Sequence, residues 1–186
     1  MNYCSDCGAI LRWGVPKGDD RPRYICDTCG MIHYQNPKVI AGCIPVWQDR
    51  ILLCRRAIEP RLGYWTLPAG YMEIGETLAE AACREAREEA NIEVELDGLY
   101  TLFDLPHIAQ VHVFFRARLL EERFSAGIES LEIRLFREEE IPWNDLSFET
   151  VYRSLKFFYA DRQHGHFTLR QEDITPETRR MLRSPL

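Results

Sequence analysis

Residues 67–92 read LPAGYMEIGETLAEAACREAREEANI, and this stretch decides the fold. In it a glycine, a glutamate, an Arg-Glu pair and a Glu-Glu pair follow one another with five, seven and two residues between them. These positions are Gly70, Glu76, Arg84 with Glu85, and Glu88 with Glu89. The spacing gathers carboxylates that repel one another unless a cation lies between them.

A helix is predicted over residues 78–90. Thr77 and Glu80 have the spacing of a capping box, and the residues that follow contain no Gly, Pro or β-branched side chain. At about 100° per residue, Glu85, Glu88 and Glu89 project from one side of this helix. Oxygen ligands of this kind suit Mg²⁺ or Mn²⁺, ions that are usually shared with substrate phosphates.

The residues before the helix complete this prediction. Arg84 lies eight residues after Glu76, so an ion pair between them would tie the helix to the preceding loop. The loop over 67–75 can bring backbone carbonyls to a metal. A glutamate-rich helix end is usually only a solvated face, but the fixed spacing favours the metal site.

The spacing resembles the signature of the Nudix hydrolases, Mg²⁺-dependent enzymes that split nucleoside diphosphates linked to another group. One position departs from it, because Asn91 stands where a Gly is expected. Asn is the next best residue for the left-handed conformation after a helix, so the geometry should survive. The resemblance implies an α/β/α sandwich with a mixed sheet.

The resemblance also assigns roles to residues. It makes Glu85 and Glu89 the main metal ligands, with Glu88 in support and the carbonyl of Ala69 as a further ligand. It makes Gly70, Glu76 and Arg84 structural partners. In many relatives the general base lies on a later loop, where the candidates are Glu129 and Glu132.

A second metal site is predicted near the N-terminus. Cys4 and Cys7 form one Cys-x-x-Cys pair, Cys26 and Cys29 form another, and eighteen residues separate the pairs. This is the spacing of a four-thiolate zinc ribbon, in which the zinc is structural. Two disulfides are the alternative. The absence of a secretory signal favours zinc in a reduced, cytoplasmic protein, and His33 is interpreted as a packing or loop residue.

We expect a zinc ribbon over 1–34, a Nudix domain over 35–170 and a partly disordered tail over 171–186. Strands are predicted over 38–47 and 50–56, joined as a hairpin, with a short strand or turn over 63–68. Further strands are expected over 92–106, 109–120 and 131–137, and a second helix over 148–162. One face of that helix is expected to carry Val151, Leu155, Phe158 and Tyr159.

Composition limits the class of protein. The 186 residues carry a net charge of −6, which argues against a broad nucleic-acid surface. No apolar run approaches the roughly 18 residues of a membrane span. We expect a nucleotide-linked small molecule as substrate and a symmetric homodimer as the assembly.

The resemblance reaches substrates as well. Zinc ribbons precede the Nudix motif in the NADH pyrophosphatases, but their Ser-Gln-Pro-Trp signature is missing here. The segments over 33–45, 64–76 and 127–148 instead resemble the plant chloroplast FAD and ADP-ribose pyrophosphatases and their bacterial relatives. This implies that FAD or ADP-ribose is cleaved and AMP released. An NADH or capped-RNA pyrophosphatase, or a non-catalytic nucleotide- or RNA-binding module, are the alternatives.

Substrate contacts are predicted from residue type. Arg55 and Arg56 could hold a phosphate, although charges at a strand end also serve solubility. Tyr34, Trp65 and Phe103 could stack on a planar base, although most aromatic side chains are simply core.

Overall fold

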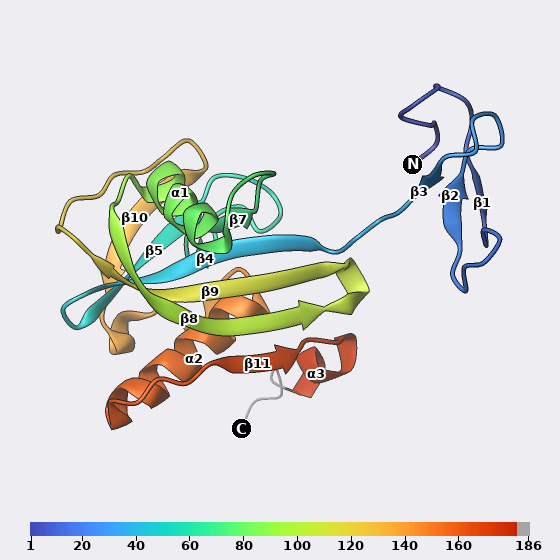
Figure 1. The fold of residues 1–186 in the computed structure, drawn as a ribbon. Coiled ribbons are helices and arrows are strands. Elements are labelled where there is room, and N and C mark those ends of the chain that lie inside the picture. The colour runs from blue at the N-terminus through green and yellow to red at the C-terminus, as the bar shows by residue number, and fades with distance from the viewer. Residues whose placement is uncertain (182–186) are drawn as a thin grey trace. The chain divides into compact units, whose positions relative to one another are not determined.

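The computed structural model describes residues 1–181 and divides the chain into two compact units, Met1–Pro37 and a unit that begins at Lys38 (Figure 1). The predicted boundary after residue 34 is close to this division. Among the described residues no helix combines the length and the apolar character needed to cross a membrane.

The first unit is a three-stranded antiparallel sheet. Its strands are β1 (Arg12–Gly14), β2 (Arg23–Ile25) and β3 (Ile32–His33), in the order β1-β2-β3. Of the large hydrophobic side chains within residues 1–37, only Ile25 is buried. The unit therefore has almost no hydrophobic core of its own.

The second unit is built on a mixed sheet with the order β10-β5-β4-β9-β8-β11. Strand β4 pairs parallel with β9, and β8 pairs parallel with β11, while the other pairs in this order are antiparallel. The short strands β6 and β7 pair with β5 and β4. The bounds are β4 (Lys38–Trp47), β5 (Arg50–Arg56), β6 (Trp65–Thr66), β7 (Ala69–Tyr71), β8 (Val94–Leu105), β9 (Gln110–Leu119), β10 (Ser130–Phe136) and β11 (Arg170–Asp173).

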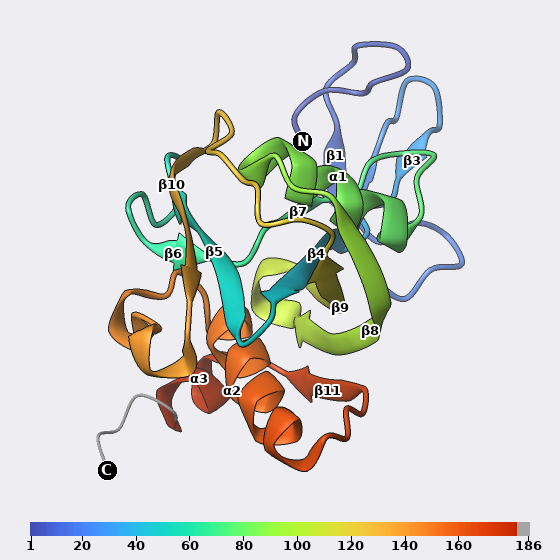
Figure 2. The ribbon, with the colours of Figure 1, turned by 90° about the vertical axis from the view of Figure 1, so that its left-hand side faces the viewer.

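Helices cover both faces of this sheet (Figures 1 and 2). α1 (Leu78–Ala90) lies on one face, and α2 (Glu149–His164) lies on the other. A short α3 (Pro176–Met181) follows β11, and single 3₁₀ turns are η1 (Pro106–Ile108), η2 (Glu138–Glu140) and η3 (Trp143–Asp145). The predicted α/β/α sandwich with a mixed sheet is confirmed.

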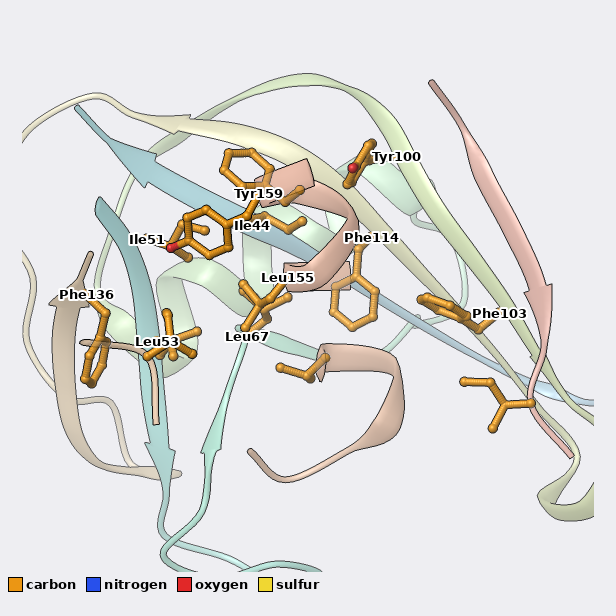
Figure 3. Packing of buried hydrophobic residues seen from close by; sticks show 14 of the residues in the cluster. Ile44, Ile51, Leu53, Leu67, Tyr100, Phe103, Phe114, Phe136, Leu155 and Tyr159 are labelled. Carbon is orange, nitrogen blue, oxygen red and sulfur yellow. The ribbon is translucent and has the colours of Figure 1, made fainter. Parts of the chain in front are cut away.

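The two cores follow from strand alternation. Successive side chains of a strand point to opposite faces, so Ile51 and Leu53 pack under α2, whereas Leu52 and Cys54 pack toward α1. Figure 3 shows the larger core, where Leu155 and Tyr159 of α2 meet the sheet. The predicted inner face of this helix is confirmed, since all four of its side chains are buried.

Two predictions need correction. Residues 170–181 are part of the domain, because β11 pairs with residues 101–104 of β8 and α3 follows it. The expected disorder of residues 182–186 lies outside the described part of the chain. Phe103, predicted to stack on substrate, is fully buried in the larger core (Figure 3).

Candidate active site

A cavity of about 950 Å³ opens on the second unit. It is bounded by β7, the C-terminal half of α1, the loop before β10, the end of β8 with η1, the start of β9 and the start of α2. Its size is that of a small-molecule site. It brings together residues from positions 40 to 174 of the chain.

Local sequence fixes α1 at this cavity. Thr77 and Glu80 form the predicted capping box, with the Glu80 amide donating to Thr77 Oγ1 at 3.2 Å and the Thr77 amide donating to Glu80 Oε2 at 2.7 Å. Asn91 ends the helix with φ of 50° and ψ of 44°, which is the left-handed conformation expected of it. Alanines on the inner face are fully buried, so the helix packs closely on the sheet.

Arg84 holds the acidic residues together. Its guanidinium donates to both carboxylate oxygens of Glu76, at 3.0 and 2.7 Å, and to the carbonyl of Tyr71 at 3.0 Å. Its Nη1 donates to Glu85 at 2.7 Å and to Glu88 at 2.9 Å. The bond from Arg84 lowers the pKa of Glu76 to about 2. The ion pair predicted from the eight-residue spacing is present.

Gly70 lies against the carboxylate of Glu85. A Cβ on Gly70 would meet the Glu85 carboxylate oxygens at 2.4 and 2.5 Å, far inside van der Waals contact. A side chain here would displace the carboxylate. The φ of Gly70 is negative, so the backbone conformation alone does not require a glycine here. A glycine is needed because the Glu85 carboxylate approaches so closely.

Glu89 provides the clearest evidence for a cation site. It is only 6% exposed, and its Oε2 is buried with no hydrogen-bond partner. Burial, reinforced by the charge of Glu85, raises the pKa of Glu89 to about 8. Burial also raises the pKa of Glu85. A buried carboxylate oxygen without a partner is costly, and a divalent cation would satisfy it.

The loop before β10 is anchored on α1. The Gly127 amide donates to the carbonyl of Glu89 at 3.0 Å, and a Cβ on Gly127 would meet the carbonyl oxygen of Glu88 at 1.7 Å. This contact brings Glu129 to the cavity wall. Glu132, the other predicted base, lies outside the cavity and pairs with Arg55 at 3.6 Å.

The two arginines at the end of β5 separate in the same way. Arg56 lines the cavity, donates to the Pro60 carbonyl at 2.8 Å and lies 5.2 Å from the ring centre of Phe148. Arg55 is exposed on the other side of the strand and donates to the Gly63 carbonyl at 3.0 Å. Alternation along the strand explains the difference.

Of the two remaining aromatic candidates, Trp65 is in the second unit and does not line the cavity. Trp65 packs edge-on against Phe136, with ring centres 4.9 Å apart. Tyr34 belongs to the first unit, where Arg23 lies over its ring at 5.0 Å.

Several polar residues that were not predicted from the sequence also line the cavity: Tyr71, Gln110, His112, Ser147 and Thr150. Gln110 and His112 alternate with apolar residues in β9, whose inward side continues to the buried Phe114. Polar residues on the inward side of a strand are the signal that could have revealed them.

The four predicted zinc ligands form a cluster in the first unit. The sulfurs of Cys4, Cys7, Cys26 and Cys29 all lie within 4.8 Å of one another. The closest pairs are 3.4 and 3.7 Å apart, which excludes disulfides, whose S–S bond is about 2.05 Å. The Cys29 amide lowers the pKa of Cys26 to about 6. Four converging sulfurs, two of them buried, fit a tetrahedral zinc ion.

His33 packs against this cluster. Its Nε2 is 3.3 Å from the sulfur of Cys4, so of the two interpretations, packing or loop residue, the contact favours packing.

Comparisons with known proteins agree with this geometry. Residues 36–161 match the NUDIX domain, and residues 2–35 match the N-terminal zinc ribbon of Nudix proteins. A crystal structure of a NUDIX hydrolase from Nitrosomonas europaea is 53% identical, with a TM-score of 0.89, and the match covers 94% of this chain and all of that one.

Among curated proteins, the NAD-capped RNA hydrolase NudC of Photorhabdus laumondii is 37% identical over 95 residues, which is 50% of this chain and 34% of that protein. The ADP-ribose pyrophosphatase of Methanocaldococcus jannaschii is 28% identical over 115 residues, 59% of this chain and 67% of that protein. The chain spans about a third of the length of the first of these relatives. The carboxylate helix, the thiolate cluster and these matches together show that the chain belongs to the Nudix hydrolase family and carries the family's N-terminal zinc ribbon.

Proposed function

We propose that this protein is a Mg²⁺- or Mn²⁺-dependent pyrophosphatase that hydrolyses the diphosphate of a dinucleotide-type substrate such as FAD or ADP-ribose and releases AMP. The observation that carries the proposal is the buried carboxylate of Glu89, which has an unpartnered oxygen beside Glu85 at the wall of a large cavity. No hydrophobic core needs such a group.

Glu85 and Glu89 would be the main ligands of the cation, with Glu88 and the carbonyl of Ala69 in support. When bound, a divalent cation supplies neutralisation of phosphate charge and acidification of the attacking water. Arg84 Nη1 donates to Glu85 and to Glu88 and so holds both carboxylates in position.

The other parts of the site have their own tasks. Glu129 is our candidate for the general base, because it is the predicted candidate that reaches the cavity. Arg56 faces the same cavity and has no carboxylate partner among the described ion pairs. Its guanidinium would therefore be available to hold a substrate phosphate.

A second candidate function is hydrolysis of a nucleotide cap on RNA. The relatives described as NAD-capped RNA hydrolases favour it, together with the exposed Trp13 and the neighbouring Arg12 of the ribbon. Against it, the four basic residues of the first unit are matched by four acidic ones.

The structural zinc, the homodimer and the cytoplasmic location stay predictions, although the seven free cysteines fit a reducing compartment.

The test is release of AMP from FAD, ADP-ribose, NADH and a capped RNA with Mg²⁺ or Mn²⁺ present. Glu89→Gln keeps the side-chain volume and removes the ligand charge, so it should lower turnover of the preferred substrate at least about 100-fold. Glu121→Gln makes the same change on an exposed residue outside the cavity and should have no effect. A folded protein that turns over none of the four substrates would contradict the proposal and favour a binding module.

A further inference from the structure

Four uncharged polar side chains form a continuous hydrogen-bonded chain in the cavity wall. Thr150 Oγ1 lies 3.1 Å from His112 Nδ1, and His112 Nε2 lies 2.9 Å from Gln110 Oε1. Gln110 Nε2 donates to the hydroxyl of Tyr71 at 3.3 Å. The chain thus joins the start of α2 to β9 and β7, and all four residues line the cavity.

The hydrogen bonds of this series all donate in the same direction, from Thr150 toward Tyr71. Gln110 Oε1 can only accept, so His112 Nε2 carries the proton and donates to it. Neutral His112 then accepts at Nδ1 from the Thr150 hydroxyl. These hydrogen bonds hold the Gln110 amide in the observed orientation, with its oxygen toward His112 and its nitrogen toward Tyr71.

The four side chains of this hydrogen-bonded series differ in burial. Thr150 and His112 are 1% and 8% exposed, whereas Gln110 is half-buried and Tyr71 is exposed. Burial lowers the pKa of His112 to about 4, which keeps the imidazole neutral near pH 7. The two buried residues therefore fix the orientation of the Gln110 amide, and the outer edge of that amide remains available to a ligand.

The oriented amide still has unused hydrogen-bonding capacity. One N–H of Gln110 and one lone pair of its oxygen have no partner in the chain, which places a donor and an acceptor side by side. Exposed apolar side chains at the same cavity, including Ile58 and Ile108, offer surfaces for a flat ring. An adjacent donor and acceptor on a glutamine match the amino group and ring nitrogen of adenine.

We propose that Gln110 is the specificity-determining residue of the cavity, recognising a 6-aminopurine by a two-point hydrogen bond, and that His112 is a positioning residue that holds the Gln110 amide in the orientation required. The inference rests on the proposed function, since it names the half of the substrate that is selected. It makes adenine the part of the substrate that is read. The group beyond the diphosphate would then be free to vary.

The test compares ADP-ribose with its hypoxanthine analogue, which has an oxygen in place of the amino group. Wild type should prefer the adenine compound in kcat/KM by between about 5-fold and about 150-fold, the range of one two-point contact. Gln110→Met removes both hydrogen-bonding groups at similar length and should bring this ratio close to one. Gln171→Met, an exposed glutamine of β11 outside the cavity, is the matched control and should leave the ratio unchanged.

The positioning role of His112 has a separate test. His112→Gln retains an amide donor that can reach Gln110 and should keep most of the adenine preference. His112→Met lacks the donor and should lose much of the preference through KM, with kcat changed less. Equal preference in the two variants, both folded, would overturn the positioning role.

Binding without turnover separates this inference from the proposed function. Calorimetry with AMP and IMP, in the absence of metal, should show the same preference in wild type and its loss in Gln110→Met. Hydrolysis with a ratio unaffected by Gln110→Met would overturn the inference and leave the pyrophosphatase standing. If neither diphosphate compound is hydrolysed, a preference for AMP that depends on Gln110 would still support the inference, and no preference would overturn it.

Discussion

The two proposed metal sites of this chain differ in almost every respect. The ribbon site consists of four sulfurs that face one another, in a unit with almost no hydrophobic core. The carboxylate site lies at the edge of a well-packed domain and faces an open cavity. The ribbon site is closed, and a metal bound there would stabilise the fold around it. The carboxylate site is open, and the fold around it holds its ligands in position.

This difference predicts that the ribbon site contributes to stability and the carboxylate site to catalysis. Carboxylates of the second unit are held in place by Arg84, Gly70 and the helix, so their position depends on packing that exists without a metal. The cysteines of the first unit are held by backbone hydrogen bonds and a contact with His33, but almost no hydrophobic core supports them. Each prediction below challenges one side of this comparison.

The largest effect is expected from removing zinc. Structural zinc supplies about 10–16 kcal/mol in small zinc-dependent units, so a chelator should unfold residues 1–37 while the second unit stays folded. Amide exchange should show loss of protection over β1 to β3 alone. Cys4→Ser should do the same, and Cys83→Ser, a half-buried cysteine of α1, should not. Protection of the ribbon that survived chelation would refute a metal-held fold.

The second effect concerns the open site. Gly70→Ala places a methyl group on the Glu85 carboxylate and should lower AMP release on the order of 100-fold, because a displacement of about 1 Å in a catalytic group has this consequence. Gly98→Ala is the control, since its φ of 115° strains any side chain but nothing lies within 4 Å. It should lower stability without a loss of activity. Equal activity of Gly70→Ala and wild type would show that Glu85 does not need its present position.

Local sequence predicted the parts of both sites that depend on neighbours along the chain. The capping box of Thr77, the turn at Asn91 and the bidentate pair of Arg84 all lie within a few helical turns, so spacing alone specifies them. The cysteine pairs are local in the same sense. Each of these features is a property of a short segment.

The predictions that failed depend on contacts between distant segments. Strand β11 forms by parallel pairing with β8, about 70 residues earlier, and a charged sequence of four residues gives no sign of it. A register shift between Ser130 and Glu132 moves Glu132 alongside Arg55 and leaves Glu129 at the cavity. Neither register nor bulges can be read from one strand alone.

The third prediction concerns acid sensitivity within the second unit. The folded pKa of His112 is about 4, below its ordinary value of 6.5, so the unfolded chain takes up a proton first as the pH falls. Stability from this residue is complete above pH 6.5 and is lost between pH 6.5 and 4. Between pH 7.5 and 5 the loss should be about 2 kcal/mol.

His112→Gln removes the titrating group and supplies the comparison. Urea unfolding of the second unit, measured for both proteins at both pH values, should show a smaller decrease for the variant. The difference isolates His112 from the carboxylates, which are common to the two proteins. Identical decreases would mean that folding does not lower the pKa of His112.

The smallest effect tests whether the second unit is held by many small contributions. Thr77→Ala removes the side-chain cap of α1 and should lower the free energy of unfolding by about 1 kcal/mol. Thr77→Ser keeps the oxygen and should restore most of it. Glu85 and Glu89 lie two to three turns beyond this cap, on the part of α1 that packs against the sheet, so AMP release should change less than about 2-fold. A large loss of activity at unchanged stability would show instead that the first turn of α1 positions the carboxylates, and the open site would then depend on a local element as strictly as the ribbon depends on its metal.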